Sequence, residues 1–246
     1  MIQVVNRAFD ILEYIARDKN KIFSLSEIAD TLKLNHATCA NIIKTMVQRN
    51  YLEQMGHKKG YRLGFMTFQI TGSDTYDQEL LKAAKPAMES LTKKINETCL
   101  LGILKRDVRF ALHQVSGNHD LIVKSSTEKA ACNSASGRLL VAMQSKEKLQ
   151  EFVERYGLPS AEFWKEASTT RGFNTEILKI QRDGYTVQTT KTHISGIAVP
   201  VYKAKEVVAS LSVYLPESRF NEKIKKDILD QLNKTSEIIS RKLSKP

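Results

Sequence analysis

The feature that most constrains this chain is a stretch in which two short amphipathic helical patterns are separated by only three residues. The stretch runs from residue 25 to residue 54, LSEIADTLKLNHATCANIIKTMVQRNYLEQ, and Lys33-Leu34-Asn35 separates the two patterns. Apolar residues recur three and four positions apart in both, which predicts two helices with one apolar side each. So short a connection brings the two helices into contact. The first is expected to be capped by Ser24 or Ser26 and to bury Leu25, Ile28, Ala29 and Leu32.

The sequence on either side of this stretch supplies the rest of a small domain. Residues 51–54 and 61–63 are predicted to form two short strands, and Gly56 and Gly60 bracket the turn between them. A further amphipathic helix is predicted before the stretch. Its apolar stripe is expected to consist of Val4, Val5, Ala8, Ile11, Leu12 and Ile15. Three helices followed by a two-stranded ribbon predict a winged helix-turn-helix.

The third helix of this domain, which Asn35 is expected to cap, has two different sides. The helical period assigns Cys39, Ile42, Ile43 and Met46 to its inner side, and Ala37, Asn41, Lys44 and Gln48 to its outer side. A helix that lies in the major groove of DNA needs a small outer side with hydrogen-bonding groups, because the groove is only about 12 Å wide. Ala37 permits close approach, Asn41 can pair with adenine, and Lys44 can reach guanine or a phosphate. The alternative interpretation is a solvated polar side without a ligand.

Charge favours the interpretation as a DNA-binding helix. The 246 residues carry a net charge of +11, and the basic turn His57-Lys58-Lys59 suits phosphates or a minor groove. Residues 1–72 hold ten Lys and Arg against six Asp and Glu, a net charge of only +4, so one copy should bind weakly and a homodimer is expected. The residues expected to contact double-stranded DNA are Asn35, His36, Ala37, Thr38, Asn41, Lys44, Gln48, His57, Lys58, Lys59 and Arg7.

Beyond the ribbon, the sequence predicts a connecting segment and a second domain. The polar stretch TGSDTYDQ at 71–78 is the predicted junction, so residues 1–71 are assigned to the DNA-binding domain. Residues 72–97 are expected to hold the linker and a long connecting helix, and residues 98–246 mix strand and helix patterns. Strands interspersed with helices predict an α+β fold of the kind found in sensor domains.

One segment of the second domain has the pattern of an anion site. Small residues at 133–137, Asn133-Ser134-Ala135-Ser136-Gly137, precede an apolar helix. Free backbone N–H groups at a helix start attract a carboxylate, and small side chains let it approach. The alternative is that Ser134 or Ser136 simply caps the helix. An anionic metabolite, such as a sugar acid or an aromatic acid, is the hypothesis for the ligand.

In order and spacing, several segments resemble the IclR (isocitrate lyase regulator) family of bacterial transcription factors. NRAFDILEYIA, the stretch 25–54 and YRLGF resemble its winged helix-turn-helix, and NSASGRLLVA resembles its ASGRALLA segment. RDGYTVQ and GIAVPVYKAKEVVASLSVYLPESRF resemble its closing strands. The resemblance implies a GAF-like α/β effector-binding domain at 98–246, and a homodimer or a dimer of dimers joined largely through the DNA-binding domains. It also implies a ligand near residues 133–137.

The same resemblance brings further residues to the effector site and shows departures from the family pattern. By analogy, Lys191, His193, Gly196 and Ile197 belong beside residues 133–137. Many members have Arg where this chain has Asn41, so no operator sequence carries over. Many members have carboxylates and a cysteine at the positions that Lys191, His193 and Gly196 occupy in this chain. A family-type effector or metal site that uses those groups is therefore not expected here.

Catalysis, metal binding and membrane insertion find little support in the sequence. No Gly-x-Ser-x-Gly elbow and no HExxH pair is present, and His113, His119 and Asp120 are too loosely spaced for a metal site. No catalytic residue, metal ligand or cofactor is therefore predicted. The three cysteines, Cys39, Cys99 and Cys132, are far apart, which fits a reducing cytoplasm. No apolar run approaches the ~20 residues of a membrane span, and charges interrupt the N-terminal apolar pattern, which argues against a signal peptide.

These patterns predict a sequence-specific transcriptional regulator, a repressor, that is controlled by a small anionic metabolite. The first alternative is a DNA-binding protein whose second domain serves only oligomerisation or protein docking. The second alternative, a hydrolase, lacks a credible pair of nucleophile and base.

Overall fold

The computed structural model describes residues 2–18, 21–56, 59–70 and 78–244, and the chain divides into two compact units, Met1–Tyr76 and Asp77–Pro246. The predicted junction at 71–78 lies outside the described residues except for Gln78. The domain limits at 71 and 97 therefore remain predictions.

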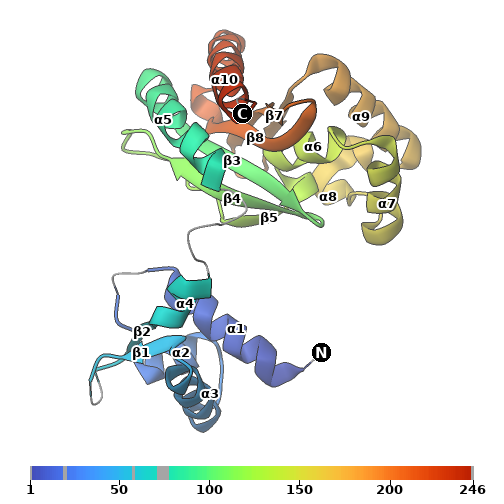
Figure 1. Cartoon of the computed structure of the whole chain (residues 1–246). Helices are drawn as coiled ribbons and strands as arrows, with labels where there is room; N and C mark the ends of the chain where they lie inside the picture. The colour runs from blue at the N-terminus through green and yellow to red at the C-terminus, as the bar shows by residue number, and fades with distance from the viewer. Residues whose placement is uncertain (1, 19–20, 57–58, 71–77, 245–246) are drawn as a thin grey trace. The chain divides into compact units, whose positions relative to one another are not determined.

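The described residues of the N-terminal unit form three helices, a two-stranded ribbon and a further short helix (Figure 1). Its elements are α1 (Gln3–Ala16), α2 (Leu25–Thr31), α3 (His36–Gln48), β1 (Leu52–Gln54), β2 (Tyr61–Leu63) and α4 (Phe65–Ile70). Ser24 caps α2 by accepting a hydrogen bond from the Glu27 backbone N–H at 3.1 Å. Ser24 was one of the two residues predicted as this cap. Helix α4 was not predicted, because its sequence, FMTFQI, is too short for a helical period to be recognised.

The core of this unit confirms the inner side of α3 and contains only part of the apolar stripe of α1. The four residues assigned to the inner side of α3 are buried. On α1 only Ile11 and Ile15 are buried, whereas Val4 and Val5 are exposed. The first turns of α1 extend past the core that α2 and α3 provide, so the apolar stripe continues into solvent.

The C-terminal unit is built on one six-stranded antiparallel sheet with helices on both faces. Its strands are β3 (Thr98–Lys105), β4 (Val108–Val115), β5 (Glu128–Ala130), β6 (Thr186–Thr189), β7 (Ile194–Lys203) and β8 (Glu206–Pro216). Its α-helices are α5 (Gln78–Ile95), α6 (Ala135–Ala142), α7 (Lys146–Tyr156), α8 (Ala161–Trp164), α9 (Thr170–Asp183) and α10 (Glu222–Leu243). The strand order is β5-β4-β3-β8-β7-β6. The last two strands of the sequence, β7 and β8, form an antiparallel hairpin, as their sequence pattern predicts. The three-residue β5 was not predicted.

The two faces of this sheet differ in chemistry. Leu101, Ile197 and Leu211 belong to a large apolar core that also contains buried side chains of α5 and α10, and Figure 1 shows these two helices side by side on the sheet. The opposite face carries Gly196 and Tyr214 as cross-strand partners, and α6 packs against it. Because successive residues of a strand point to opposite faces, the first face is apolar and the second holds polar and small residues.

Candidate functional site

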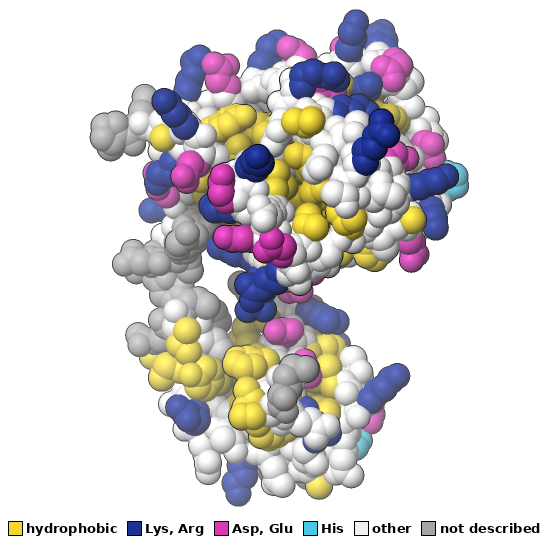
Figure 2. Space-filling view, turned by 90° about the vertical axis from the view of Figure 1, so that its right-hand side faces the viewer, with side chains coloured by type: hydrophobic (Ala, Val, Ile, Leu, Met, Phe, Trp, Pro, Cys, Tyr) yellow, Lys and Arg dark blue, Asp and Glu magenta, His cyan; other side chains and the backbone are white. Residues whose placement is uncertain are grey.

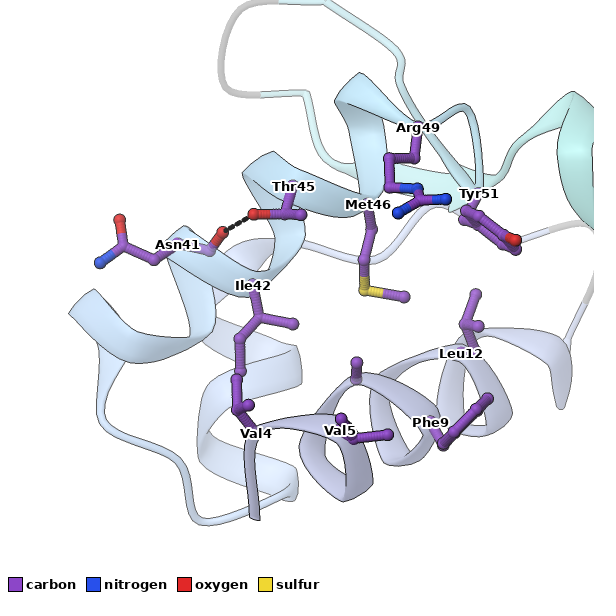
Figure 3. A pocket seen from close by; sticks show the side chains of 11 residues that line it. Val4, Val5, Phe9, Leu12, Asn41, Ile42, Thr45, Met46, Arg49 and Tyr51 are labelled. Carbon is purple, nitrogen blue, oxygen red and sulfur yellow. Dashed lines mark hydrogen bonds between the residues drawn. The ribbon is translucent and has the colours of Figure 1, made fainter. Parts of the chain in front are cut away.

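The outer side of α3 is a small polar surface that the rest of the N-terminal unit leaves exposed. Ala37, Asn41, Lys44 and Gln48 are all exposed, as the helical period predicts. The Thr45 hydroxyl donates a hydrogen bond to the Asn41 backbone carbonyl at 3.0 Å. Figure 3 shows the Asn41 amide extending away from α1. The surface therefore presents hydrogen-bonding groups that can reach base edges.

The leading end of α3 has a cap and one side-chain contact at the surface. Asn35 Oδ1 accepts hydrogen bonds from the backbone N–H groups of Ala37 at 2.9 Å and of Thr38 at 3.4 Å, so the predicted N-cap is confirmed. His36 Nε2 lies 2.9 Å from Asp30 Oδ1, and both side chains are exposed. Asn35 and His36 thus have structural partners of their own, and a contact with DNA would have to use the parts of these side chains that remain accessible.

The ribbon that follows α3 is docked on the segment before α2. Phe23 and Tyr61 exchange two backbone hydrogen bonds, at 2.9 and 2.8 Å, which adds a bridge to the β1–β2 pair. Gly60 has φ of +105°, and a Cβ there would lie 2.6 Å from the Phe23 carbonyl oxygen, so this close approach requires glycine. Of the predicted basic tip, His57 and Lys58 lie outside the described residues, and Lys59 is exposed.

An apolar groove between α1 and α3 is a surface that the sequence interpretation missed. It encloses about 580 Å³, and Val4, Val5, Phe9, Ile42 and Met46 are among its lining residues (Figure 3). Figure 2 shows hydrophobic side chains gathered on the surface of this unit. Val5 is 43% exposed and Phe9 57% exposed. The sequence did contain one signal for this groove. The apolar stripe of α1 is longer than the part of this helix that a core of three helices can bury. Arg7 also lies on α1, half-buried.

The predicted effector segment in the C-terminal unit is buried and hydrogen-bonded within the protein. Ser134 Oγ accepts a hydrogen bond from the Gly137 backbone N–H at 3.1 Å, and the Ser136 and Tyr214 hydroxyls lie 2.8 Å apart. Ala135 is also fully buried, and Asn133 is half-buried. A Cβ at Gly196 would lie 2.6 Å from the Tyr214 ring, so the glycine makes room for that ring. The cap interpretation of Ser134 is confirmed, and Tyr214 occupies the space beside the start of α6.

Of the other predicted effector residues, the structure brings Gly196 beside Ala135 at the start of α6, where a Cβ would lie 3.4 Å from Ala135 Cβ. The remaining three have other surroundings. Ile197 belongs to the apolar core on the α5 and α10 side of the sheet. Lys191 is exposed in the turn before β7. The His193 side chain is 83% exposed, and its Nδ1 lies 2.7 Å from Glu217 Oε2. The analogy placed these residues by their position in the sequence, but strand alternation and an exposed turn direct them elsewhere.

Arg138, directly after the predicted effector segment, holds the surrounding helices together. Its Nε donates to the Cys132 carbonyl at 3.0 Å, and its guanidinium carbon lies 4.7 Å from the centre of the Trp164 ring. Burial lowers the pKa of Arg138 to about 10 and raises the pKa of Cys132 to about 11. At neutral pH the arginine is therefore charged and the cysteine is a neutral thiol, which fits a structural role for both.

Within the described ranges, no set of three or more His, Cys, Asp or Glu side chains is arranged to hold a metal ion. None of the helices in the same ranges is long and apolar enough to span a bilayer.

A winged helix-turn-helix with an exposed polar α3, followed by a helix-flanked antiparallel sheet, defines the class of two-domain DNA-binding regulators. Comparison with known proteins is consistent with this class. Residues 4–56 match the IclR helix-turn-helix domain, and residues 74–241 match the model described as "Bacterial transcriptional regulator IclR C-terminal". The chain belongs to the IclR family of transcriptional regulators, which are not enzymes.

Individual relatives can be aligned with almost the whole chain. The HTH-type transcriptional regulator KdgR of Dickeya chrysanthemi is 24% identical over 97% of this chain and 79% of the relative. The crystal structure of the Thermotoga maritima IclR superposes with a TM-score of 0.73 at 19% identity and covers 100% of both chains. An IclR homolog from Microbacterium hydrocarbonoxydans, complexed with 4-hydroxybenzoate, gives a TM-score of 0.76 at 22% identity over 98% of both chains. The protein is thus a DNA-binding transcriptional regulator with an effector-binding C-terminal domain.

Proposed function

We propose that this regulator reads its operator as a homodimer through the outer side of α3, and that a small anionic metabolite bound to the C-terminal domain shifts it between DNA-competent and DNA-incompetent states. The proposed output is repression, because a dimer bound across an operator excludes other proteins from that DNA. The proposed location is the cytoplasm, where bacterial DNA lies. The observation that carries the proposal is the exposure of Asn41 and Lys44 on a helix whose other side is buried.

The geometry of α3 supports direct contact with bases. A recognition helix contacts base edges with residues near its N-terminal end, and Ala37 and Asn41 lie in the first two turns of α3. Asn can bind adenine with two hydrogen bonds, and the small Ala37 permits a close approach or a contact with a thymine methyl group. Lys44 and Lys59 carry the charge that phosphate contacts require.

The groove between α1 and α3 supports dimerisation of the N-terminal units. Exposed apolar side chains that gather in a groove mark an interaction surface. Asn41 is also among the residues that line this groove, and its amide extends away from α1 (Figure 3). A second copy there would cover the apolar ends of both α1 helices and would double the number of phosphate contacts. A dimer of dimers through the C-terminal units remains a further proposal, which the family resemblance suggests.

A small organic acid is the proposed effector. The relative bound to 4-hydroxybenzoate supports this class of ligand, since that ligand carries a carboxylate. The ligand can change the equilibrium between two states only by the difference in its affinity for them. The alternative, a C-terminal domain without a small ligand, predicts no thermal stabilisation of the protein by any compound of a metabolite panel.

Asn41→Ala is expected to weaken binding to the specific operator by about 1–3 kcal/mol and to relax the base preference at one position of each half-site. Asn41 is exposed, so the substitution should leave the stability of the unit unchanged within about 0.5 kcal/mol. The measurement is fluorescence anisotropy on a duplex selected by the wild-type protein from a random pool, with a scrambled duplex alongside.

Lys59→Ala is the matched control for this experiment. Lys59 is exposed in the ribbon turn and is proposed to contact phosphate, so its loss should weaken binding to both duplexes alike and reduce the salt dependence. If Asn41→Ala also weakens both duplexes equally, Asn41 does not read a base and the proposed role of α3 is wrong.

A further inference from the structure

One cavity of the C-terminal unit is lined by charged side chains from three helices. Residues of α6, α8, α9, α10 and the edge strand β6 enclose about 200 Å³, and Figure 1 shows α6, α8 and α9 together on one side of this unit. A water molecule takes up about 30 Å³ of liquid, so the cavity has room for roughly seven waters or for one small molecule. Its charged lining residues are Arg138, Glu176, Lys179, Asp183 and Lys225.

Arg138 lines this cavity with hydrogen-bond donors that the protein does not use. Its Nε donates to the Cys132 carbonyl and its Nη2 to the Phe163 carbonyl, whereas its Nη1 makes no hydrogen bond to the described part of the chain. No carboxylate in the same part of the chain forms an ion pair with Arg138. Arg109 of β4 also lacks an ion pair there, but it is fully buried, whereas Arg138 is half-buried and borders the cavity. Since a guanidinium has five N–H donors, Arg138 can still bind a ligand.

Glu176 lines the same cavity as a carboxylate without a partner. It is half-buried on α9 and forms neither a hydrogen bond nor an ion pair with any described residue. Burial lowers the pKa of Arg138, and the charge of Glu176 is close enough to act in the opposite direction. The two opposite charges therefore border one space without touching. A charge that is partly removed from water is costly unless it is paired, so a group that joins these two would be bound favourably.

The other charges at the cavity have less need of a ligand. Asp183 and Lys225 each form an ion pair with a neighbouring residue of their own helix, and Lys179 is exposed to solvent. Arg138 and Glu176 are thus the two half-buried charges of this lining that lack an ion pair among the described residues. A ligand with a single charge would pair with one of them and be repelled by the other.

We propose that this cavity binds a small zwitterion, a free α-amino acid with a small side chain. The carboxylate of the amino acid accepts hydrogen bonds from Nη1 of Arg138, and its ammonium group donates to Glu176. Both groups are attached to one carbon atom, so the ligand bridges two side chains that do not reach each other. The volume suits glycine, alanine or serine. None of residues 133–137 lines this cavity, so the site is distinct from the proposed effector segment and adds a second ligand to the regulator.

The test measures binding to the full-length protein by isothermal titration calorimetry and by tryptophan fluorescence. Trp164 is the single tryptophan of the chain and lines the cavity, so its emission reports on this site. The probes are glycine, L-alanine and L-serine, with propionate and ethylamine, each of which carries one of the two charges of alanine. We expect at least one amino acid to change the emission and to bind about tenfold more tightly than either singly charged probe.

Glu176→Gln separates recognition from a structural role. Because Glu176 has no partner among the described residues, the variant should fold as the wild type does. It should bind the amino acid about tenfold more weakly and propionate more tightly than the wild type, since the carboxylate that repels propionate is gone. Glu128→Gln removes an exposed carboxylate from β5, at the opposite edge of the sheet, and is the matched control that should leave both affinities unchanged. Ethylamine tests the contribution of Arg138, whose substitution would also disturb the contacts with Cys132 and Phe163.

Several results would overturn the assignment. These are absence of binding by all three amino acids, equally tight binding of propionate or ethylamine, and unchanged binding by Glu176→Gln. Binding that leaves the emission of Trp164 unchanged would place the amino acid elsewhere and would also exclude the cavity. The proposed reading of DNA by α3 and the proposed control by an organic acid do not depend on this site and are tested by their own experiments.

Discussion

Phe9→Asp is expected to prevent dimerisation through the N-terminal units and to reduce the affinity of the protein for a two-fold operator at least 100-fold. Phe9 is 57% exposed and lines the groove between α1 and α3, so the substitution should cost the isolated unit little stability. In a dimer that covers this groove, the new carboxylate would be buried without a partner, which costs several kcal/mol. About 2.7 kcal/mol already corresponds to a factor of 100 in affinity.

Sedimentation equilibrium and fluorescence anisotropy on the selected duplex measure the two effects. Leu178→Asp is the control, because Leu178 is also a large exposed apolar residue, 65% exposed, but lies on α9 in the C-terminal unit. It should leave the affinity for the operator close to that of the wild type. A Phe9→Asp protein that sediments as the wild type does and binds the operator equally well would exclude the groove as the dimer surface.

Gly137→Ala is expected to destabilise the C-terminal unit by on the order of 3 kcal/mol, a large effect for the addition of one methyl group. The glycine lies in the first turn of α6, and a Cβ there would lie 2.1 Å from the Ala131 carbonyl oxygen. This neighbour is backbone, held by the short helical turn at Ala131–Asn133, so it cannot rotate away as a flexible side chain can. The expected consequence is a displaced α6 and a loss of any effector response.

Gly184→Ala provides the comparison, because it adds the same methyl group where space is available. Gly184 ends α9 with φ of +73°, and no neighbour among the described residues lies within 4 Å of the point that a Cβ would occupy. Only the left-handed backbone conformation therefore costs free energy, about 1–2 kcal/mol. Urea unfolding followed by fluorescence measures both variants, since the single tryptophan of the chain, Trp164, is buried in the C-terminal unit and reports on that unit alone. Equal losses for the two variants would show that the close approach at Gly137 relaxes easily.

The N-terminal unit was predictable in most of its parts because local interactions determine them. The caps at Ser24 and Asn35 depend on residues two or three positions away, and the burial of Ile42 and Ile43 follows from the helical period. The period also placed Val4 and Val5 on the apolar stripe of α1, but both are exposed, because the period shows which side of a helix is apolar and not how far the neighbouring helices extend. The groove that results from this difference exists only in the folded unit.

The face of the sheet that packs against α6 was predictable only in part. The cap at Ser134 was one of the two interpretations of its segment, and the structure confirms it. The hydrogen bond between Ser136 and Tyr214 joins residues 78 positions apart, and no local pattern indicates it. Arg109 gave no signal, since an arginine within a short strand pattern is normally assigned to an exposed edge.

By itself, the sequence determined the two-domain organisation, the winged helix-turn-helix, the polar outer side of α3 and the family. The winged helix-turn-helix and the outer side of α3 depend on residues within a turn or two of each other, where spacing fixes geometry. The domain organisation and the family were indicated by the order of segments along the chain. Only the tertiary structure decided that α1 borders an exposed apolar groove, that Lys191 and His193 are exposed, and that Arg109 is buried with no carboxylate partner among the described residues. The physical reason is that burial and charge compensation depend on residues far apart in the chain, which strand pairing and helix packing bring together.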